Sequence, residues 1–362
     1  MGPNVSRAVR ANFSRTSKNV TLESATITSN ESPDSPDTTI RLVTSLSDND
    51  LTREYHGVED SEYFLPSDVD EQDRLELQFL IMTVNSITCY DTCSKGQFFK
   101  LSFVCLVTLN SFKRRDIVRN DIKEFLAITP NCKILDVGCA NGWWLDSIGK
   151  IYPTAELHGV DLAPSVIETA EKFLPKGKFF AGNVTSGLPY EDNTFDFVHQ
   201  RYLVVGLQKS QFPGVIRELM RVTKPGGWIE LVELDMTFSR CGPIFQNYLD
   251  KLAEVMAPRE FDVLAGTNLL SYVALAAQKT RFRVKKITKA IVSMPINWGG
   301  PLGDMVATDF KQAIYNVEDI MYKPLGIARE EFKSEADKMI DESKDYKAFS
   351  NTHAVSFQIE KK

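Results

Sequence analysis

A short loop rich in small residues follows an apolar run near the middle of the chain, and it suits the binding of a small polar cofactor. The run Ile134–Val137 contains an aspartate and leads into Gly138–Gly142. Glycines allow a positive φ and a close approach of the backbone to a ligand. Parallel strands deliver such loops to the carboxyl edge of a sheet, where α/β proteins bind ligands. The motif predicts cofactor-binding residues at Asp136, Gly138, Cys139, Ala140 and Gly142.

The spacing of the glycines restricts the class of cofactor. A dinucleotide fingerprint needs glycines at 138, 140 and 143, but the chain has Ala140 and Trp143. A P-loop needs Gly-Lys-Ser/Thr after a longer loop, and that sequence is absent here. We therefore expect a nucleoside cofactor without a pyrophosphate.

Two polar residues end the next two predicted strands. Asp161 follows Val160. Its carboxylate could accept hydrogen bonds from both ribose hydroxyls, or it could instead cap a helix. Asn183 follows the third strand, and its side-chain amide lies beside the backbone N–H of Val184. Such a pair can recognise the edge of an adenine ring.

His199 follows the fourth predicted strand and is the best-placed imidazole for a general base. The alternation Phe195, Phe197, His199 could equally bury this ring as a structural histidine. We keep both interpretations. Gln200 and Arg201 come directly after it and are expected to line the cofactor or acceptor pocket.

A regular alternation of strands and helices begins near residue 115 and predicts a parallel, doubly wound α/β sheet. Strands are expected at 133–137, 156–160, 178–181, 195–199, 228–234, 282–294 and 352–359. Helices are expected at 116–127, 144–151, 164–173, 210–222, 243–257, 262–278, 304–322 and 329–343. The turn at 223–227 should stop a helix and feed the next strand.

Composition excludes several classes of function. The chain has 362 residues and a net charge of −6, which disfavours general attraction to nucleic acid. Its six cysteines lack metal-ligand spacing, so we expect free thiols, no metal site and a reducing compartment, the cytoplasm or the nucleus. The polar first 20 residues carry no apolar core of a secretory leader, and no stretch is apolar enough for a membrane span.

The chain divides into four predicted parts. Residues 1–52 are rich in Ser, Thr, Asn and Asp and read as a disordered tail. Residues 53–82 form a cap segment with a helix that packs on the main domain, and 83–112 are an atypical insertion. The main domain covers 113–362, with a cofactor-binding core at 133–235 and acceptor-side elements at 236–362.

Five segments together resemble the core of class I S-adenosylmethionine-dependent methyltransferases. They are Ile134–Gly142, Val160–Leu162, Asn183–Pro189, Thr194–Val198 and Arg221–Glu233. The resemblance implies a Rossmann-like, seven-stranded sheet whose last strand, supplied by 352–359, is antiparallel. It also implies S-adenosyl-L-methionine as cofactor and a small molecule or protein as methyl acceptor.

Roles for individual residues follow from the same resemblance. The Asp136–Gly142 loop would face the methionine part of the cofactor, and Asp161 would hold the ribose. Leu162 would pack on the adenine, while Asn183 and Val184 would bind its edge. Two positions depart from the common pattern: Ala140 replaces a glycine, and Asn183 replaces an aspartate, with its carbonyl oxygen as the expected acceptor.

A narrower resemblance links the chain to fungal methyltransferases that include the velvet-complex regulators of secondary metabolism. It rests on Glu62–Pro66, Asp70–Leu75, Phe197–Leu203 and Trp298–Gly300, and it covers about 55–82 and 115–360. Tyr63 is then expected to close over the cofactor. Residues 83–112 do not match and are either a lineage-specific insertion or a retained intron. The alternative function is a methyltransferase-like regulator that acts through a protein partner.

Overall fold

The computed structural model describes Arg74 and residues 118–362, which belong to one compact unit, Arg53–Lys362. The predicted tail at 1–52, the insertion at 83–112 and Tyr63 lie outside the described residues. Of the predicted cap segment, Arg74 alone is described. It is helical and buried, and its Nη1 lies 3.1 Å from Asp309 Oδ1.

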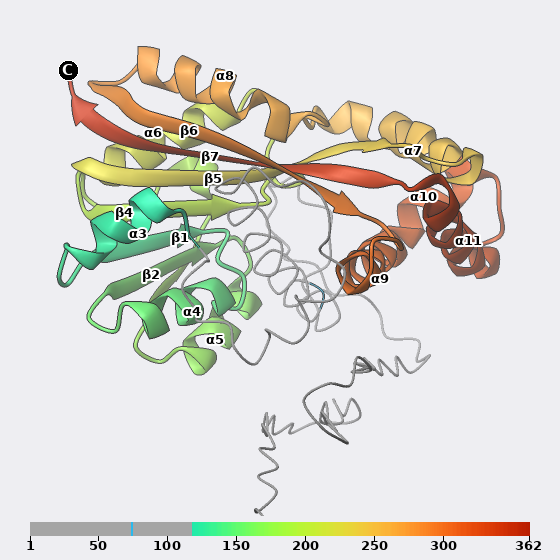
Figure 1. Ribbon diagram of the computed structural model, residues 1–362, viewed down its shortest axis with the longest axis horizontal. Helices are drawn as coiled ribbons and strands as arrows, with labels where there is room; N and C mark the ends of the chain where they lie inside the picture. Colours follow the sequence, from blue (N-terminus) through green and yellow to red (C-terminus); the bar gives the residue numbers. More distant parts are fainter. Residues whose placement is uncertain (1–73, 75–117) are drawn as a thin grey trace, which may run out of the picture. The chain divides into compact units, whose positions relative to one another are not determined.

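A seven-stranded sheet forms the centre of the described region, in the order β3-β2-β1-β4-β5-β7-β6 (Figure 1). The strands are β1 (Lys133–Val137), β2 (Glu156–Asp161), β3 (Lys178–Ala181), β4 (Phe195–Arg201), β5 (Thr223–Ser239), β6 (Phe282–Pro295) and β7 (Phe349–Lys361). The five strands β3, β2, β1, β4 and β5 are parallel to their neighbours. β7 lies antiparallel between β5 and β6, which confirms the predicted antiparallel last strand.

Helices cover both faces of this sheet, as a doubly wound fold requires (Figure 1). The helices are α3 (Asn120–Ala127), α4 (Trp143–Ile151), α5 (Pro164–Phe173), α6 (Phe212–Val222), α7 (Pro243–Met256), α8 (Ala265–Gln278), α9 (Pro301–Asn316), α10 (Glu318–Leu325) and α11 (Phe332–Tyr346). α3, α4 and α5 pack on the face that carries Ile134, Phe197 and Trp228. α6 and α8 pack on the opposite face, against Val198 and Ile229.

A third buried cluster joins α7, α9, α10 and α11 at the far ends of the long strands (Figure 1). Phe245 of α7 and Phe332 of α11 are its largest fully buried members from the helices, and Met321 of α10 is fully buried beside them. Strand residues Val232 and Met294 join the same cluster. None of the helices in the described part of the chain is both long and apolar enough to cross a membrane.

The predicted elements are confirmed in kind and order, while some of their boundaries differ. β5 begins at Thr223, so the predicted turn at 223–227 is an irregular start of the strand. Gly226 adopts a φ of +85° there, and its carbonyl oxygen accepts a hydrogen bond from Gln358 Nε2 of β7. At its other end β5 continues to Ser239, because β7 pairs with it as far as Phe349.

The predicted helix at 304–322 is two helices. α9 starts at Pro301, whose missing N–H costs nothing in the first turn of a helix. The chain breaks at Val317 and continues as α10. α8 starts later than predicted, because Asp262 lies in the preceding turn, where its carboxylate accepts bonds from the Leu264 N–H and from the Asn268 side chain of the helix.

Candidate functional site

The loop after β1 is held in an uncommon backbone conformation at three positions. Gly138, Ala140 and Gly142 have φ angles of +76°, +46° and +83°. The N–H groups of Gly138 and Cys139 donate to the Val160 carbonyl oxygen at 2.8 and 3.1 Å, which ties the loop to the end of β2. A left-handed φ costs a non-glycine residue about 1–2 kcal/mol. Ala140, one of the two departures from the family pattern, therefore carries this strain.

Asp161 connects two of the predicted cofactor loops. Its Oδ2 accepts a hydrogen bond from the Ala140 N–H at 2.9 Å, and its Oδ1 accepts one from the Ala163 N–H at 3.2 Å. Burial raises the pKa of this carboxyl above its ordinary value. The backbone N–H of Leu162 also donates to this carboxylate, so at least one of its roughly four lone-pair positions remains for a ligand. Asp161 does not cap α5, whose N-cap residue is Ala163, and it lies at a position suited to a ribose.

Close packing beneath the loop explains a glycine that the sequence analysis missed. A Cβ atom on Gly159 of β2 would lie 2.7 Å from Cys139 Sγ and 2.6 Å from the Phe179 ring. The Cys139 side chain is buried, and burial raises the pKa of its thiol well above the usual value. A neutral buried thiol is a poor nucleophile. Cys139 thus supports the loop by packing, and the sequence His158-Gly159-Val160 was the available signal for Gly159.

Asn183 does not use its carbonyl oxygen as the sequence analysis expected. Oδ1 of Asn183 accepts two hydrogen bonds from Thr185, one from the backbone N–H at 3.0 Å and one from Oγ1 at 2.8 Å. Both lone pairs of that oxygen are occupied by this helix cap. The side-chain NH2 group remains available as a donor, while the expected acceptor oxygen already has two donors from Thr185. Val184 begins the 3-10 helix, whose first N–H has no partner within the helix.

Leu162 lies between β2 and α5 at the same edge of the sheet. Its side chain is half-buried and belongs to none of the three buried clusters. An apolar side chain in that position has surface available for a flat ring.

His199 lies on β4 and is almost fully buried, with 2% of its surface exposed. Its Nδ1 lies 2.8 Å from Asp136 Oδ1, and its ring stacks on Trp144 with centroids 4.0 Å apart. Strand register places Asp136, His199 and Glu230 side by side on β1, β4 and β5. These contacts support the structural interpretation of His199 that the sequence analysis left open.

Glu230 extends this polar row to the antiparallel part of the sheet. Its Oε1 accepts a hydrogen bond from Ser356 Oγ of β7 at 3.1 Å. Burial raises the pKa of the Glu230 carboxyl, and the nearby His199 opposes that shift. Arg201 follows on the same strand as His199, and burial lowers the pKa of its guanidinium.

Glu233 is a second residue that the sequence analysis missed. It is fully buried on β5, and its carboxylate accepts hydrogen bonds from the backbone N–H groups of Leu203 and Val204 at 2.9 and 3.1 Å. Burial raises its pKa to about 8. The available signal was an acid within the apolar run Ile229–Leu234.

Leu203 brings this loop onto the glycine loop. A Cβ atom on Gly138 would lie 2.7 Å from Leu203 Cδ2, so only glycine leaves room for the leucine. The neighbouring Gln200 is buried, and its Oε1 has no hydrogen-bond partner in the described region. A buried acceptor without a partner is costly, and it offers a site for a ligand donor. Glu233, Leu203 and Gly138 therefore link β5 to the predicted cofactor loop.

The structure thus brings the loop after β1, Asp161, Leu162, Asn183 and Gln200 to the carboxyl ends of adjacent parallel strands. In residues 118–362 and at Arg74, no three His, Cys, Asp or Glu side chains group as metal ligands do. The role of Tyr63 stays a prediction, since it lies outside the described residues.

Comparison with known proteins agrees with this geometry. Residues 134–227 match the family model described as "Methyltransferase domain". The chain is 29% identical over 154 residues to the secondary metabolism regulator laeA of Coprinopsis cinerea, covering 39% of this chain and 37% of that protein. It is 35% identical over 105 residues to N-methyltransferase sirN of Leptosphaeria maculans, covering 29% and 36% of the two chains.

A longer match, at lower identity, is to methyltransferase str2 of Strobilurus tenacellus. It is 26% identical over 195 residues and covers 51% of this chain and 67% of that protein. The chain therefore spans between about a third and two thirds of the length of these curated relatives. The matched segment contains the glycine loop, Asp161 and Asn183, and the sheet around it has the antiparallel last strand that the resemblance implied. Residues 134–227 of the chain are therefore similar to the methyltransferase domain family.

Proposed function

We propose that this chain transfers a methyl group from S-adenosyl-L-methionine to an acceptor. The observation that carries the proposal is the meeting of three strand ends: the positive-φ loop after β1, Asp161 after β2 and Asn183 after β3. When bound, the cofactor would supply a methyl group on a sulfonium: the acceptor's lone pair would bond to the methyl carbon as the C–S bond breaks, and S-adenosylhomocysteine would leave. The protein's contribution is alignment of the two reactants and exclusion of water.

The residues of the site suit different parts of this cofactor. Asp161 offers an acceptor position to the ribose hydroxyls beside the bonds that its carboxylate accepts from backbone N–H groups. The side-chain NH2 of Asn183 would donate to a ring nitrogen of adenine, and Leu162 would cover one face of the ring. The partnerless Oε1 of Gln200 is suited to accept a bond from the amino group of the methionine part.

The acceptor side favours a nucleophile that already carries a free lone pair. His158, His199 and His353 are all buried, so the described region presents no exposed imidazole to remove a proton. A hydroxyl must lose a proton during transfer, whereas an unprotonated amine need not lose one before it attacks. We therefore propose an amine as the acceptor, which agrees with the N-methyltransferase name of one relative.

Calorimetric titration of the full chain with S-adenosyl-L-methionine tests the cofactor. We expect saturable binding, and S-adenosylhomocysteine should compete for the same site. Absence of binding by a folded protein would refute the proposal. Incubation with methyl-labelled cofactor and a panel of primary and secondary amines, with the matching alcohols as controls, tests the acceptor class.

The second candidate is a regulatory protein that keeps the fold and acts through a partner. It is supported by the match to a relative named as a secondary metabolism regulator. Tight cofactor binding, together with no transfer to amines, alcohols or the protein itself, would favour this candidate. Comparison of small molecules and methylated proteins between deletion and wild-type strains would then separate a missing product from a missing partner.

A further inference from the structure

A cavity of about 390 Å³ lies between α6 and the start of β6. It is at the amino ends of β4 and β5, because Asp192 precedes β4 and Arg221 precedes β5. The predicted cofactor loops lie at the opposite, carboxyl ends of the parallel strands. This cavity is therefore separate from the proposed methyl-transfer site, and neither one depends on the other.

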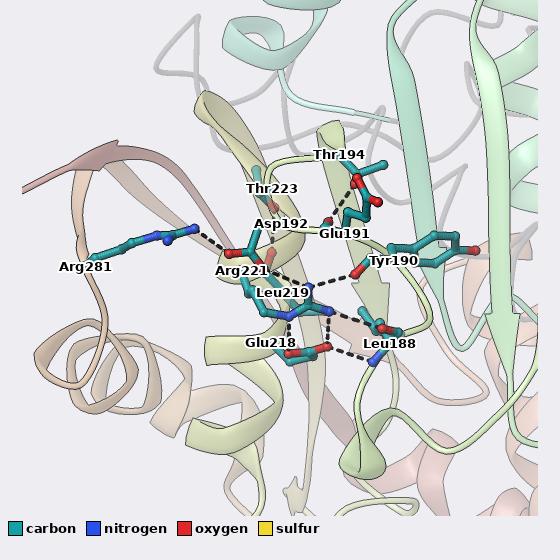
Figure 2. Close-up of polar contacts among 10 residues, drawn as sticks. All are labelled: Leu188, Tyr190, Glu191, Asp192, Thr194, Glu218, Leu219, Arg221, Thr223 and Arg281. Carbon is teal, nitrogen blue, oxygen red and sulfur yellow. Dashed lines mark hydrogen bonds and ion pairs between the residues drawn. The ribbon is translucent and has the colours of Figure 1, made fainter.

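Arg221 forms one wall of the cavity and is fully engaged in holding the fold (Figure 2). Its Nε and Nη2 donate to the Glu218 carboxylate at 2.8 and 2.6 Å, and its Nη1 donates to Asp192 Oδ1 at 3.0 Å. It also donates to the carbonyl oxygens of Leu188 and Tyr190 at 3.1 and 2.7 Å. Its bonds lower the pKa of Glu218 and Asp192, so both acids stay ionised.

Three other cations around the cavity make fewer hydrogen bonds within the protein than Arg221 does. Arg281 donates one hydrogen bond, from Nη2 to Asp192 Oδ2 at 2.6 Å (Figure 2). For Arg217 and Lys279, the described region supplies no ion pair or side-chain hydrogen bond. Together with Arg221, these residues make four cations against two carboxylates, which leaves an excess of two positive charges in the lining.

Gly214 keeps the cavity open at a position where the fold does not need glycine. It lies in the first turn of α6, and glycine favours a helix less than alanine does. A Cβ atom there would meet only Arg217 Nη2, at 3.6 Å, which is an ordinary contact. A longer side chain at 214 would therefore occupy the space beside the Arg217 guanidinium without displacing the core.

We propose that this cavity binds the phosphate group of a phosphate monoester. The doubly charged group matches the excess of two positive charges, and guanidinium groups bind phosphate oxygens in pairs. The cavity volume suits a small ligand or a single modified side chain. Asp192 and Glu218 disfavour a long polyanion, because it would extend over both carboxylates. The phosphate arrives either on a free small molecule or on a phosphorylated serine.

Calorimetric titrations of the full chain at low salt, with inorganic phosphate, O-phosphoserine and a short phosphoserine peptide, test this site. We expect saturable binding that weakens about tenfold or more in the double variant R217Q/K279Q, since hydrogen bonds to charged groups are lost. Tighter binding of the peptide than of O-phosphoserine identifies a phosphorylated chain as the ligand. Equal binding identifies a free phosphate ester.

Two further variants separate binding from folding and from net charge. Gly214→Leu should weaken phosphate binding while leaving every charge in place, and Gly214→Ala should raise the stability of α6 with a smaller effect on binding. The pair K338Q/K344Q removes the same charge from exposed positions of α11 and should leave binding unchanged. No saturable binding of any of the three probes, or an equal loss in the α11 control, would overturn the proposal.

Discussion

His199 Nδ1 lies 2.8 Å from Asp136 Oδ1, within a row of polar groups that crosses the sheet beneath the predicted cofactor edge. Trp144 covers the imidazole, so the two side chains are shielded from water by the helix that follows the glycine loop. A buried carboxylate that loses a hydrogen-bond partner destabilises the folded state. The pair therefore makes a structural contribution that can be separated from methyl transfer.

Replacement of His199 by alanine should lower the free energy of unfolding by about 1–3 kcal/mol, because the buried Asp136 carboxylate loses this hydrogen bond. Urea unfolding measures this loss. H158A is the matched control: His158 also lies buried on a parallel strand, but its partner Glu156 is partly exposed and can be hydrated. A loss in H199A no larger than in H158A would contradict the structural role. If H199A kept its stability and its cofactor affinity but no longer transferred a methyl group, a catalytic role of His199 would be supported instead.

The buried Glu233 should make stability depend on pH. Its pKa is raised from the ordinary value of 4.5 to about 8 in the folded protein, so folding takes up a proton between those two values. The unfolded state then binds fewer protons, and the free energy of unfolding falls as pH rises from 4.5 to about 8. The neutral amide in the variant E233Q cannot ionise, so this variant should lose that part of the pH dependence.

Urea unfolding of both proteins at several pH values on either side of neutrality measures the difference. As pH rises, the free energy of unfolding of E233Q should increase relative to that of the wild type. E233D keeps an ionisable carboxyl, so its free energy of unfolding should not increase in this way. Parallel curves for wild type and E233Q would show that Glu233 does not titrate in this range.

Asp161 should be the most sensitive side chain for cofactor binding. Asp161→Ala removes both the expected ribose acceptors and the bonds to the Ala140 and Ala163 N–H groups. We expect affinity for S-adenosyl-L-methionine to fall by about a hundredfold, since two charge-assisted hydrogen bonds are lost. Asp146→Ala is the control, because Asp146 lies in the neighbouring α4 and pairs with Lys150. Calorimetry on both variants decides whether the loss is specific to position 161.

Ala140→Gly should stabilise the protein by about 0.5–1 kcal/mol, because the residue has a φ of +46° that glycine adopts without strain. Ala163→Gly at the same edge is the contrast. Ala163 has an extended φ of −88°, so glycine there only adds freedom to the unfolded chain and should destabilise by a similar amount. Equal effects of the two changes would refute the strain at Ala140.

Local patterns predicted most of the fold. The order of strands and helices from residue 133 onward follows from the periodicity of apolar residues, and that prediction is confirmed. Boundaries were less certain, since the length of β5 depends on pairing with β7, which is distant in the sequence. The end of α9 at Asn316 likewise depends on packing among α7, α10 and α11 and not on a local stop signal.

The sequence by itself determined which residues are predicted to bind the cofactor, because they follow successive strands at spacings that a parallel sheet brings to one edge. Only the tertiary structure decided how those residues act. In the folded chain, Thr185 donates to the Asn183 carbonyl oxygen, and His199 is buried against Asp136. Glu233 accepts a hydrogen bond from the N–H of Leu203, which packs on the glycine loop. Those contacts join residues on different elements. Their hydrogen bonds and burial depend on register and packing, which a linear pattern does not contain.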